Sequence, residues 1–372
     1  MKRLQLYRFL CNSLALDFHP DRKKSLVAEL DSGRIPWKKF LMMASSHLVL
    51  QTIFRIYRDH DLLGHIPGEV SAELEKIYLL NYSRNEEMMH LCGEINSILK
   101  NGGIEPIFTK GIGSLLQNMY KDTGDRLMAD ADLLVHFDQL RPAVQLLSEK
   151  GYTHLKELDQ EKIPDLKHFP RIFKPGSLIS FELHWEPVKP GFRHLLNTDQ
   201  VATNTIYSPN GLFRTMSWQH ALQHTFIHVQ LEHHAHFMAH TFLRYMYDVA
   251  LISQHVDPDE ALQTLPGRQN SFASYLHLTG KTLDIERLCT PAIMKDSSKL
   301  FLLRAKLNYK TRFFSFIYKV VRLIFGVYLP KIAKTIINKN ARKEMIRKLS
   351  SSAWIRRHLN VYKKLFRGPG NK

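Results

Sequence analysis

The stretch DTGDRLMADADLLV, residues 122–135, contains the two carboxylates on which the prediction of the fold and of the active site depends. Its second half continues as ADADLLVHF (129–137), which is short, apolar and followed by a turn, and therefore predicts a β-strand. Asp130 and Asp132 lie two residues apart at the start of this strand, so their side chains point to the same face of the sheet. Two converging carboxylates repel each other unless a cation lies between them, and Mg²⁺ prefers such oxygen ligands. The pair is a candidate metal site, although D-x-D alone also occurs at solvated strand ends.

A third carboxylate lies in a second predicted strand. The segment LISFELHWEP (178–187) is apolar, ends in proline and carries Glu182 in its middle. Phe181 and Leu183 point to one face of this strand, so Glu182 shares the other face with His184. An acidic side chain within an apolar strand needs a partner or a metal ion. Two aspartates and one acid from a neighbouring strand can hold two metal ions, an arrangement that serves phosphoryl and nucleotidyl transfer.

A glycine-containing turn precedes these carboxylates. IEPIFTKG (104–111) predicts a short strand and IGSLLQNMYKD (112–122) predicts a helix. Glycines at such a turn let backbone N–H groups approach a phosphate, and the start of a helix favours negative charge. The turn is not a Walker loop, and taken alone it is more typical of a tight strand-to-helix connection. The candidate phosphate-binding residues are Lys110, Gly111, Gly113 and Ser114.

Most of the remaining chain has a helical pattern. Apolar residues recur every three or four positions in 47–63 and 69–103, which predicts helices in the first 100 residues. FDQLRPAVQLLSEKGY (137–152) predicts a helix between the two carboxylate strands, and helices resume from residue 217. Strands and helices therefore alternate over roughly 104–190, as in an α/β unit. We expect four regions: an N-terminal helical region (1–100), an α/β core (101–205), a helical region that completes the cleft (206–300) and a basic tail (301–372).

Polar side chains are frequent in the helices after residue 217. His220, His224 and His228 recur every four residues and share one face of the predicted helix, and they are followed by His233, His234, His236 and His240. Histidines four apart can bind zinc, but H-E-x-x-H is absent and no cysteine lies nearby. We therefore interpret this face as lining the cleft or a seam between domains. Arg244 and Asp248, four apart on the next helix, are expected to pair with each other.

These segments together resemble an uncharacterised nucleotidyltransferase family of the DNA polymerase β-like superfamily. The motifs that carry the resemblance are the lysine–glycine turn at Lys110, Arg126 shortly before D-x-D-L-L-V, a helix ending in G-Y and a strand with E-L-H-W. The resemblance spans roughly 30–255. It implies an α+β fold with a polymerase β-like nucleotidyltransferase core, in which a small mixed sheet is packed with helices and flanked by N- and C-terminal helical regions.

The resemblance also implies roles for particular side chains. Asp130 and Asp132 would bind two Mg²⁺ ions, for which Mn²⁺ can substitute. Glu182 would complete the metal site or take the proton from the acceptor hydroxyl. The turn of Lys110–Gly111 would stand where the superfamily has the glycine–serine loop that holds the triphosphate. This turn departs from the standard glycine–serine form, and Gly113-Ser114 lies close by. Arg126 is the candidate for the triphosphate charge. The candidates for contact with the acceptor are His184 and His228.

The implied reaction transfers a nucleoside monophosphate from an NTP, such as ATP, to a hydroxyl or phosphate acceptor and releases pyrophosphate. An acceptor hydroxyl, activated by one metal ion, would attack the α-phosphorus in line. The second ion and the Lys110 turn would hold the β- and γ-phosphates. Catalysis would consist mostly of positioning and charge neutralisation. The sequence leaves the base of the NTP and the chemistry of the acceptor open.

Composition excludes several other classes of protein. The 372 residues are 44% hydrophobic and 10% aromatic, too apolar for a disordered chain. The three cysteines, Cys11, Cys92 and Cys289, are far apart, which argues against a disulfide scaffold or a cysteine-rich zinc site. The N-terminus lacks the pattern of a signal peptide, so we expect a cytoplasmic setting.

The net charge of +17 is concentrated at the end of the chain, where 301–372 contains 19 Lys or Arg and a single acidic residue, Glu344. The segment 311–330 is apolar and aromatic but interrupted by cations, which predicts an amphipathic helix in a membrane interface rather than a spanning helix; its cations are Arg312, Lys319 and Arg322. The following cations would add attraction to an anionic leaflet, so 311–372 is a candidate for peripheral binding to the inner membrane face. A grip on the phosphate backbone of nucleic acid and a plain extension of the fold are the alternatives.

Three functional hypotheses follow. The first is the Mg²⁺-dependent nucleotidyltransferase described above, at a membrane surface. The second is an RNA-modifying nucleotidyltransferase whose basic tail grips the nucleic acid. The third is a catalytically silent scaffold or docking protein, which the presence of all three carboxylates disfavours.

Overall fold

The computed structural model describes residues 1–159, 163, 165–233, 235–238, 241–310, 317, 320–321, 324–325 and 328–356. The chain divides into two compact units. The first comprises residues 1–237 and 241–302, and the second comprises 238–240 and 303–372. The finer division into four regions stays a prediction.

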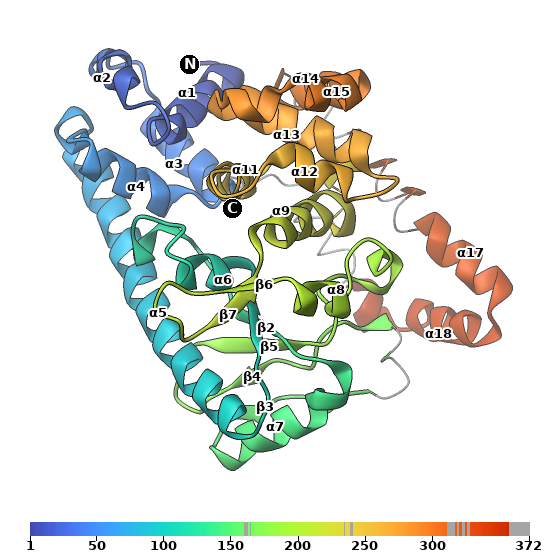
Figure 1. The fold of residues 1–372 in the computed structure, drawn as a ribbon. Helices are drawn as coiled ribbons and strands as arrows, with labels where there is room; N and C mark the ends of the chain where they lie inside the picture. Colours follow the sequence, from blue (N-terminus) through green and yellow to red (C-terminus); the bar gives the residue numbers. More distant parts are fainter. Residues whose placement is uncertain are drawn as a thin grey trace. The chain divides into compact units, whose positions relative to one another are not determined.

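A seven-stranded mixed sheet forms the centre of the first unit (Figure 1). The strand order is β3-β4-β5-β2-β1-β7-β6, and the expected α+β fold is confirmed. The pairs β2–β5 and β1–β7 are parallel, and the other neighbours are antiparallel. The strands are β1 (Ile107–Thr109), β2 (Ala131–Leu134), β3 (Thr153–His154), β4 (Ile172–Phe173), β5 (Ser180–His184), β6 (Thr205–Tyr207) and β7 (Arg214–Met216).

The three strands that the sequence predicts are present as β1, β2 and β5, each shorter than the apolar segment that predicts it. Four further strands were not predicted. They have two or three residues each, so they contain too few positions for an alternating pattern to be visible. Of these four, β4 is inserted between β3 and β5 and extends the sheet on the side of the predicted carboxylate strands.

Of the N-terminal helices, α5 runs along one side of the sheet (Figure 1), whereas α1 contacts α13. The longest is α5, which has 34 residues and contacts both α4 and α7. Its start follows Pro67, and it ends where Gly103 adopts a positive φ of 76°, a conformation that glycine accepts readily. The helices and helical turns of this region are α1 (Arg3–Ala15), η1 (Pro20–Arg22), α2 (Lys23–Asp31), α3 (Trp37–Ser46), α4 (Leu50–Asp59), η2 (Leu63–His65) and α5 (Gly68–Asn101).

The other helices connect the strands or follow the sheet in sequence. Within the sheet region they are α6 (Lys110–Leu116), η3 (Thr123–Asp125), η4 (Phe137–Gln139), α7 (Leu140–Glu149), η6 (Pro190–Phe192) and α8 (Thr198–Thr203). After the sheet they are α9 (Trp218–Phe226), the π-helical turn η7 (Ile227–Glu232), α10 (Ala235–Met238), α11 (Leu243–Ile252), α12 (Pro258–Gln263), α13 (Gln269–Leu283), η8 (Glu286–Cys289), α14 (Pro291–Asp296) and α15 (Lys299–Lys310).

A buried ionic cluster ties the N-terminal helices to the rest of the first unit. Arg55 on α4 is fully buried and donates to both carboxylate oxygens of Asp125 at 2.9 Å. It also donates to Asp17 at 2.6 Å and to the hydroxyl of Tyr247, on α11, at 2.9 Å. Removing one member of such a cluster leaves an uncompensated buried charge, so it fixes how these elements pack.

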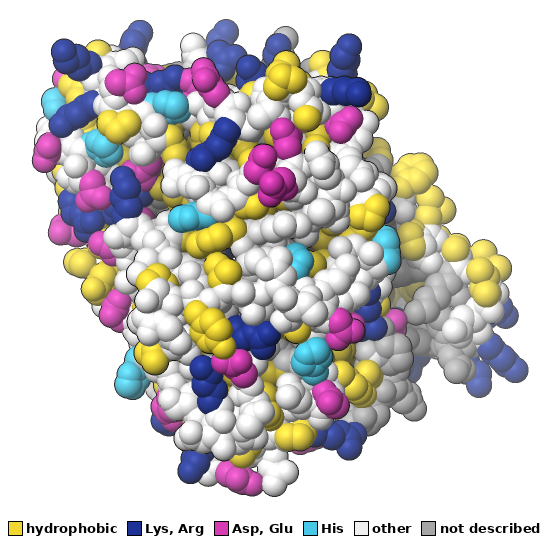
Figure 2. Space-filling model, viewed as in Figure 1, with side chains coloured by type: hydrophobic (Ala, Val, Ile, Leu, Met, Phe, Trp, Pro, Cys, Tyr) yellow, Lys and Arg dark blue, Asp and Glu magenta, His cyan; other side chains and the backbone are white. Residues whose placement is uncertain are grey.

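The surface of the first unit carries both signs of charge. On the face that Figure 2 shows, Lys and Arg side chains are interspersed with Asp and Glu. This agrees with the near balance of acidic and basic residues over 1–300. The excess positive charge of the chain therefore belongs to its last 72 residues.

The second unit contains α17 (Leu329–Ile337) and α18 (Lys339–Leu349), which pack against each other. Ile336 and Ile337 on α17 are largely exposed. Most of the predicted interfacial helix 311–330, including Arg312, Lys319 and Arg322, lies outside the described residues. In the part of the chain that the structure describes, no helix has the length and apolar character needed to cross a bilayer.

Candidate active site

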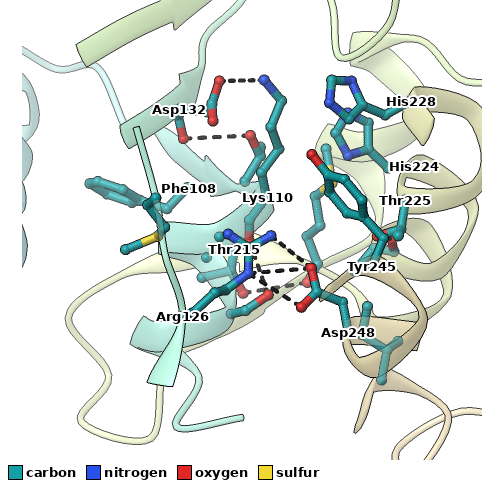
Figure 3. Close-up of a pocket in the computed structure, with 18 of the residues that line it drawn as sticks. Phe108, Lys110, Arg126, Asp132, Thr215, His224, Thr225, His228, Tyr245 and Asp248 are labelled. Atoms are coloured by element: carbon teal, nitrogen blue, oxygen red, sulfur yellow. Dashed lines mark hydrogen bonds and ion pairs between the residues drawn. The ribbon is translucent and has the colours of Figure 1, made fainter. Parts of the chain in front are cut away.

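A cavity of about 340 Å³ lies between the sheet and the helices that follow it (Figure 3). Its volume falls in the range usual for sites that bind small molecules, about 300–1,000 Å³. One wall is formed by β2 and the start of α6, and the facing wall by α9, η7 and α11. The structure brings nearly all the predicted site residues to this cavity: Lys110, Gly111, Gly113, Ser114, Arg126, Asp130, Asp132, Glu182 and His228.

The turn from β1 to α6 depends on close backbone approaches. The sequence places the turn at Gly111, whereas the structure starts α6 at Lys110, whose φ is +54°. A Cβ added at Gly113 would lie 2.7 Å from the carbonyl oxygen of Phe108. A Cβ at Gly111 would meet the guanidinium of Arg126. Both glycines are therefore required by packing.

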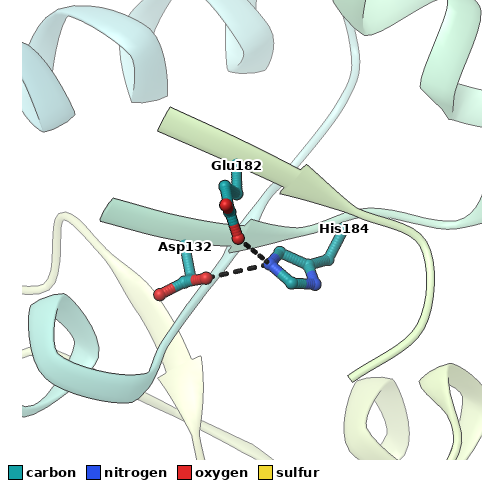
Figure 4. A group of neighbouring side chains, drawn as sticks. All are labelled: Asp132, Glu182 and His184. Atoms are coloured by element: carbon teal, nitrogen blue, oxygen red, sulfur yellow. Dashed lines mark hydrogen bonds and ion pairs between the residues drawn. The ribbon is translucent and has the colours of Figure 1, made fainter. Parts of the chain in front are cut away.

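Two carboxylates and one imidazole meet on the sheet (Figure 4). Asp132 on β2 is the register partner of Glu182 on β5. Nε2 of His184 lies 2.8 Å from Oδ1 of Asp132 and 3.4 Å from Oε2 of Glu182. Within the described ranges, these residues form the one group of three metal-type ligands, with all ligand atoms within 4.8 Å of one another. The donor set suits a divalent metal ion, since carboxylates and an imidazole are ligands for such ions and their ligand atoms lie close together.

Asp130 lies beside this group and outside it. Its Oδ2 is 2.5 Å from Nη2 of Arg171, and Nε of the same arginine is 3.0 Å from Oε1 of Glu182. Nζ of Lys110 lies 2.5 Å from Oδ1 of Asp132. In this structure, two cationic side chains thus balance most of the charge of the three carboxylates.

The neighbouring charges set the protonation of these acids. Burial would raise the pKa of Asp132, but the Lys110 ammonium and the hydrogen bond from His184 outweigh it and hold this pKa far below its usual value. Burial opposes ionisation of Glu182 as well, yet His184 and His168 lower its pKa to about 2. Burial and the two neighbouring carboxylates raise the pKa of Asp130. Asp132 and Glu182 are therefore ionised at neutral pH, as metal ligands must be.

The facing wall presents histidines, and two of them stack. The rings of His224 and His228 are 5.9 Å apart with nearly parallel planes, so the predicted shared face is confirmed for this pair. The predicted continuous helix is interrupted there, because residues 227–232 form a π-helical turn, a feature frequent at functional sites. His233 also lines the cavity, whereas His234 and His240 lie outside the described residues. None of the described histidines of 220–236 belongs to the metal-type group.

A carboxylate fixes the orientation of His228. Its Nδ1 lies 3.2 Å from Oε2 of Glu232, which also accepts a hydrogen bond from the buried Lys167 at 3.0 Å. Burial lowers the pKa of His228 to about 3, so the ring is neutral at physiological pH. A neutral ring that donates from Nδ1 has an accepting Nε2.

Arg126, the predicted triphosphate ligand, is paired with a residue of α11. Its Nη2 donates to Oδ2 of Asp248 at 2.7 Å, and the hydroxyl of Tyr120 donates to the same carboxylate. Arg244 instead donates to the carbonyl of Leu127 at 3.0 Å and lies over the ring of Tyr245. The predicted pairing of Arg244 with Asp248 is therefore wrong: both residues line the cavity, but the Asp248 carboxylate pairs with the buried Arg126 and the Arg244 guanidinium with the backbone of Leu127.

Several residues of the site were missed in the sequence. Arg171 immediately precedes β4, a strand of two residues that gives no detectable pattern. Glu232 follows His228 by four positions, which is the spacing of a helical pair and could have indicated the contact. Lys167 lies in a loop and gave no such signal.

The comparison with known families agrees with this geometry. The chain matches the family described as uncharacterised nucleotidyltransferase over residues 33–271, which is well over half of its length. The matched range includes both walls of the cavity. No curated protein matches the chain. The protein is therefore a member of the uncharacterised nucleotidyltransferase family.

Proposed function

We propose that the protein transfers a nucleoside monophosphate from an NTP to a hydroxyl or phosphate acceptor, with release of pyrophosphate and dependence on Mg²⁺. The observation that carries this proposal is the register of β2 and β5, which sets Asp132 opposite Glu182 beside a cavity of substrate size. Membership of the nucleotidyltransferase family supports the class of reaction.

The residues that would hold the metal ions are Asp132, Glu182 and His184, with Asp130 at the edge of the group. We propose that two Mg²⁺ ions bind here and that Mn²⁺ can substitute for them. When bound, the ions supply positive charge to the entering and leaving oxygens of the transfer. The protein contributes the fixed position of the ligands on two paired strands.

The nucleotide is expected to lie along the β1–α6 turn. Lys110 can offer its ammonium, and the missing side chain of Gly111 lets the Arg126 guanidinium approach the backbone of the turn. The hydroxyl of Ser114 donates to the carbonyl of Lys110 at 3.0 Å and would have to turn to reach a phosphate. Arg126 faces the same cavity and is held there by Asp248.

His228 is the better candidate for the acceptor side. Its accepting Nε2 belongs to a ring that lines the cavity, so it can orient a hydroxyl donor. His184 is nearly buried, lies against both carboxylates and is absent from the cavity lining. We therefore assign His184 to the metal group and His228 to the acceptor.

Calorimetric titration of each NTP in the presence of Mg²⁺ tests this proposal. Wild type is compared with the double variant Asp130→Ala/Asp132→Ala. Metal-dependent binding of one NTP that disappears in the variant supports the assignment and selects the nucleotide, ATP or another. If the folded wild type binds no NTP, the enzyme proposal fails and the silent scaffold is favoured.

We further propose that the enzyme works in the cytoplasm on the inner membrane face, to which the basic tail 311–372 attaches it. The excess of Lys and Arg after residue 301 and the exposed isoleucines of α17 support this assignment. Sedimentation with vesicles of anionic phospholipid should exceed sedimentation with neutral vesicles. Salt-sensitive binding of RNA without binding to vesicles would instead favour the RNA-modifying alternative.

A further inference from the structure

Arg171 occupies the place between two of the three carboxylates. Its guanidinium reaches Asp130 at 2.5 Å through Nη2 and Glu182 at 3.0 Å through Nε. An ion held by Glu182 and the neighbouring acids would compete with this guanidinium for the same oxygens. In the structure, the Arg171 guanidinium therefore occupies a position where the carboxylates would otherwise attract a metal ion.

The two cations of the site differ in how freely they can leave. The Lys110 side chain is 18% exposed and is anchored at a turn whose backbone has a positive φ. The Arg171 side chain is 55% exposed and lies at the rim of the cavity. Because Arg171 is the more exposed of the two, we infer that it is the exchangeable cation of the pair.

A guanidinium released from a carboxylate has a second partner available in the proposed reaction. The planar fork of Arg binds phosphate as well as carboxylate through two parallel hydrogen bonds. A triphosphate entering the cavity with its metal would bring both the cation that displaces Arg171 and the anion that receives it.

We propose that Arg171 makes the binding of metal and triphosphate mutually dependent. In the free enzyme it neutralises Asp130 and Glu182 and weakens the binding of free metal ions. When the metal–triphosphate complex binds, Arg171 leaves the carboxylates and contacts a phosphate. This inference rests on the proposed function, since it assumes that the carboxylates bind metal.

The test measures Mn²⁺ binding by electron paramagnetic resonance in the absence of nucleotide, for wild type and Arg171→Gln. The variant should bind Mn²⁺ about tenfold more tightly, a factor within the range usual for coupling between sites. It should bind the Mn²⁺–tripolyphosphate complex, a probe that needs no knowledge of the base, more weakly than wild type. Arg171→Lys, which keeps the charge but loses the fork, should lie between the two.

Lys174→Gln is the matched control. Lys174 flanks the same short strand, is 40% exposed and pairs at 2.7 Å with Glu94, away from the carboxylate group. It should leave both affinities within twofold of wild type, and circular dichroism with thermal unfolding should show that all variants are folded.

The outcomes separate the two proposals. If wild type binds both probes and Arg171→Gln binds Mn²⁺ no more tightly, the exchange is refuted while the proposed function stands. If Mn²⁺ binding tightens but the complex binds equally well, the contact with phosphate is refuted. If neither wild type nor Arg171→Gln binds Mn²⁺ or the complex, the carboxylates are not a metal site and both proposals fail.

Discussion

Asp132 lies directly opposite Glu182 in the parallel pairing of β2 with β5. The two residues are fifty positions apart in sequence, and this register alone makes them neighbours on one face of the sheet. Because both side chains are ionised and adjacent, their mutual repulsion must be offset, and His184, Lys110 and Arg171 provide that compensation.

Asp132→Asn should abolish nucleotidyl transfer while preserving the shape of the side chain. The amide is a poor metal ligand and no longer balances the charge of Lys110. Removing a residue that only supports a metal ligand lowers activity about 10- to 100-fold, so we expect a larger loss of activity here. The measurement is release of pyrophosphate with the NTP selected by calorimetry. Asp138→Asn, in η4 and away from the cavity, is the control and should retain activity.

Gly111→Ala should disturb the nucleotide-binding turn. The added Cβ would lie 2.6 Å from the sulfur of Met128 and would also meet Arg126, so we expect a destabilisation of about 1–3 kcal/mol and weaker NTP binding. Urea unfolding and calorimetry provide the two measurements. Gly93→Ala, in the middle of α5 with nothing within 4 Å of the new Cβ, should instead stabilise the protein by about 0.5–1 kcal/mol. Equal effects of the two substitutions would contradict the packing argument.

His228→Ala should slow transfer to the acceptor without weakening the binding of Mg²⁺–NTP. The variant loses the accepting Nε2 that faces the cavity, and positioned groups of this kind contribute about 10²–10⁴-fold to rate. Rates and NTP affinities are measured side by side. His220→Ala, eight residues earlier on α9 and outside the cavity lining, should leave both unchanged. A loss of NTP affinity in His228→Ala would show that this histidine serves the nucleotide instead.

At acidic pH, protonation of Asp17 should weaken the cluster around Arg55 and lower the free energy of unfolding. Burial opposes ionisation of Asp17, but the hydrogen bond and charge of Arg55 lower its pKa from 3.8 to about 2. A carboxyl whose folded pKa is lower than its unfolded pKa stabilises the fold above the unfolded value, and this stabilisation is lost as the pH falls from about 4 to 2. The shift corresponds to about 2 kcal/mol.

The measurement is urea unfolding of wild type and Asp17→Asn at several pH values. The difference in unfolding free energy should shrink below pH 4, and a constant difference would contradict this assignment. Asp125 acts in the opposite sense, because burial raises its pKa to about 7 despite Arg55, so its contribution to stability decreases as the pH rises from about 4 to 7.

The part of the site that the sequence predicts is the part that follows from local pattern. Alternation along a strand places Glu182 and His184 on one face, and the structure agrees, with 3.4 Å between Nε2 and Oε2. The glycines of the turn are also visible in the sequence, because their need for close approach is a local property.

The rest depends on contacts between distant segments. Nothing near Arg171 indicates that it reaches Asp130, since the contact requires β4 to pair beside β5. The spacing of Arg244 and Asp248 favours a helical pair worth about 0.2–0.5 kcal/mol. That small preference is outweighed by the buried contact of Asp248 with Arg126, which no local pattern predicts.

The cluster around Arg55 also determines how far the chain can be shortened from its N-terminus. Tyr247 and Asp248 are consecutive on α11; the first contacts Arg55, and the second contacts Arg126 in the cavity. The family match begins at residue 33, so a chain shortened to that boundary would retain Arg55 and lose Asp17. The guanidinium that contacts Tyr247 would then keep Asp125 but lose both of its hydrogen bonds to Asp17. We therefore expect that the stable catalytic unit of this protein begins upstream of the family boundary.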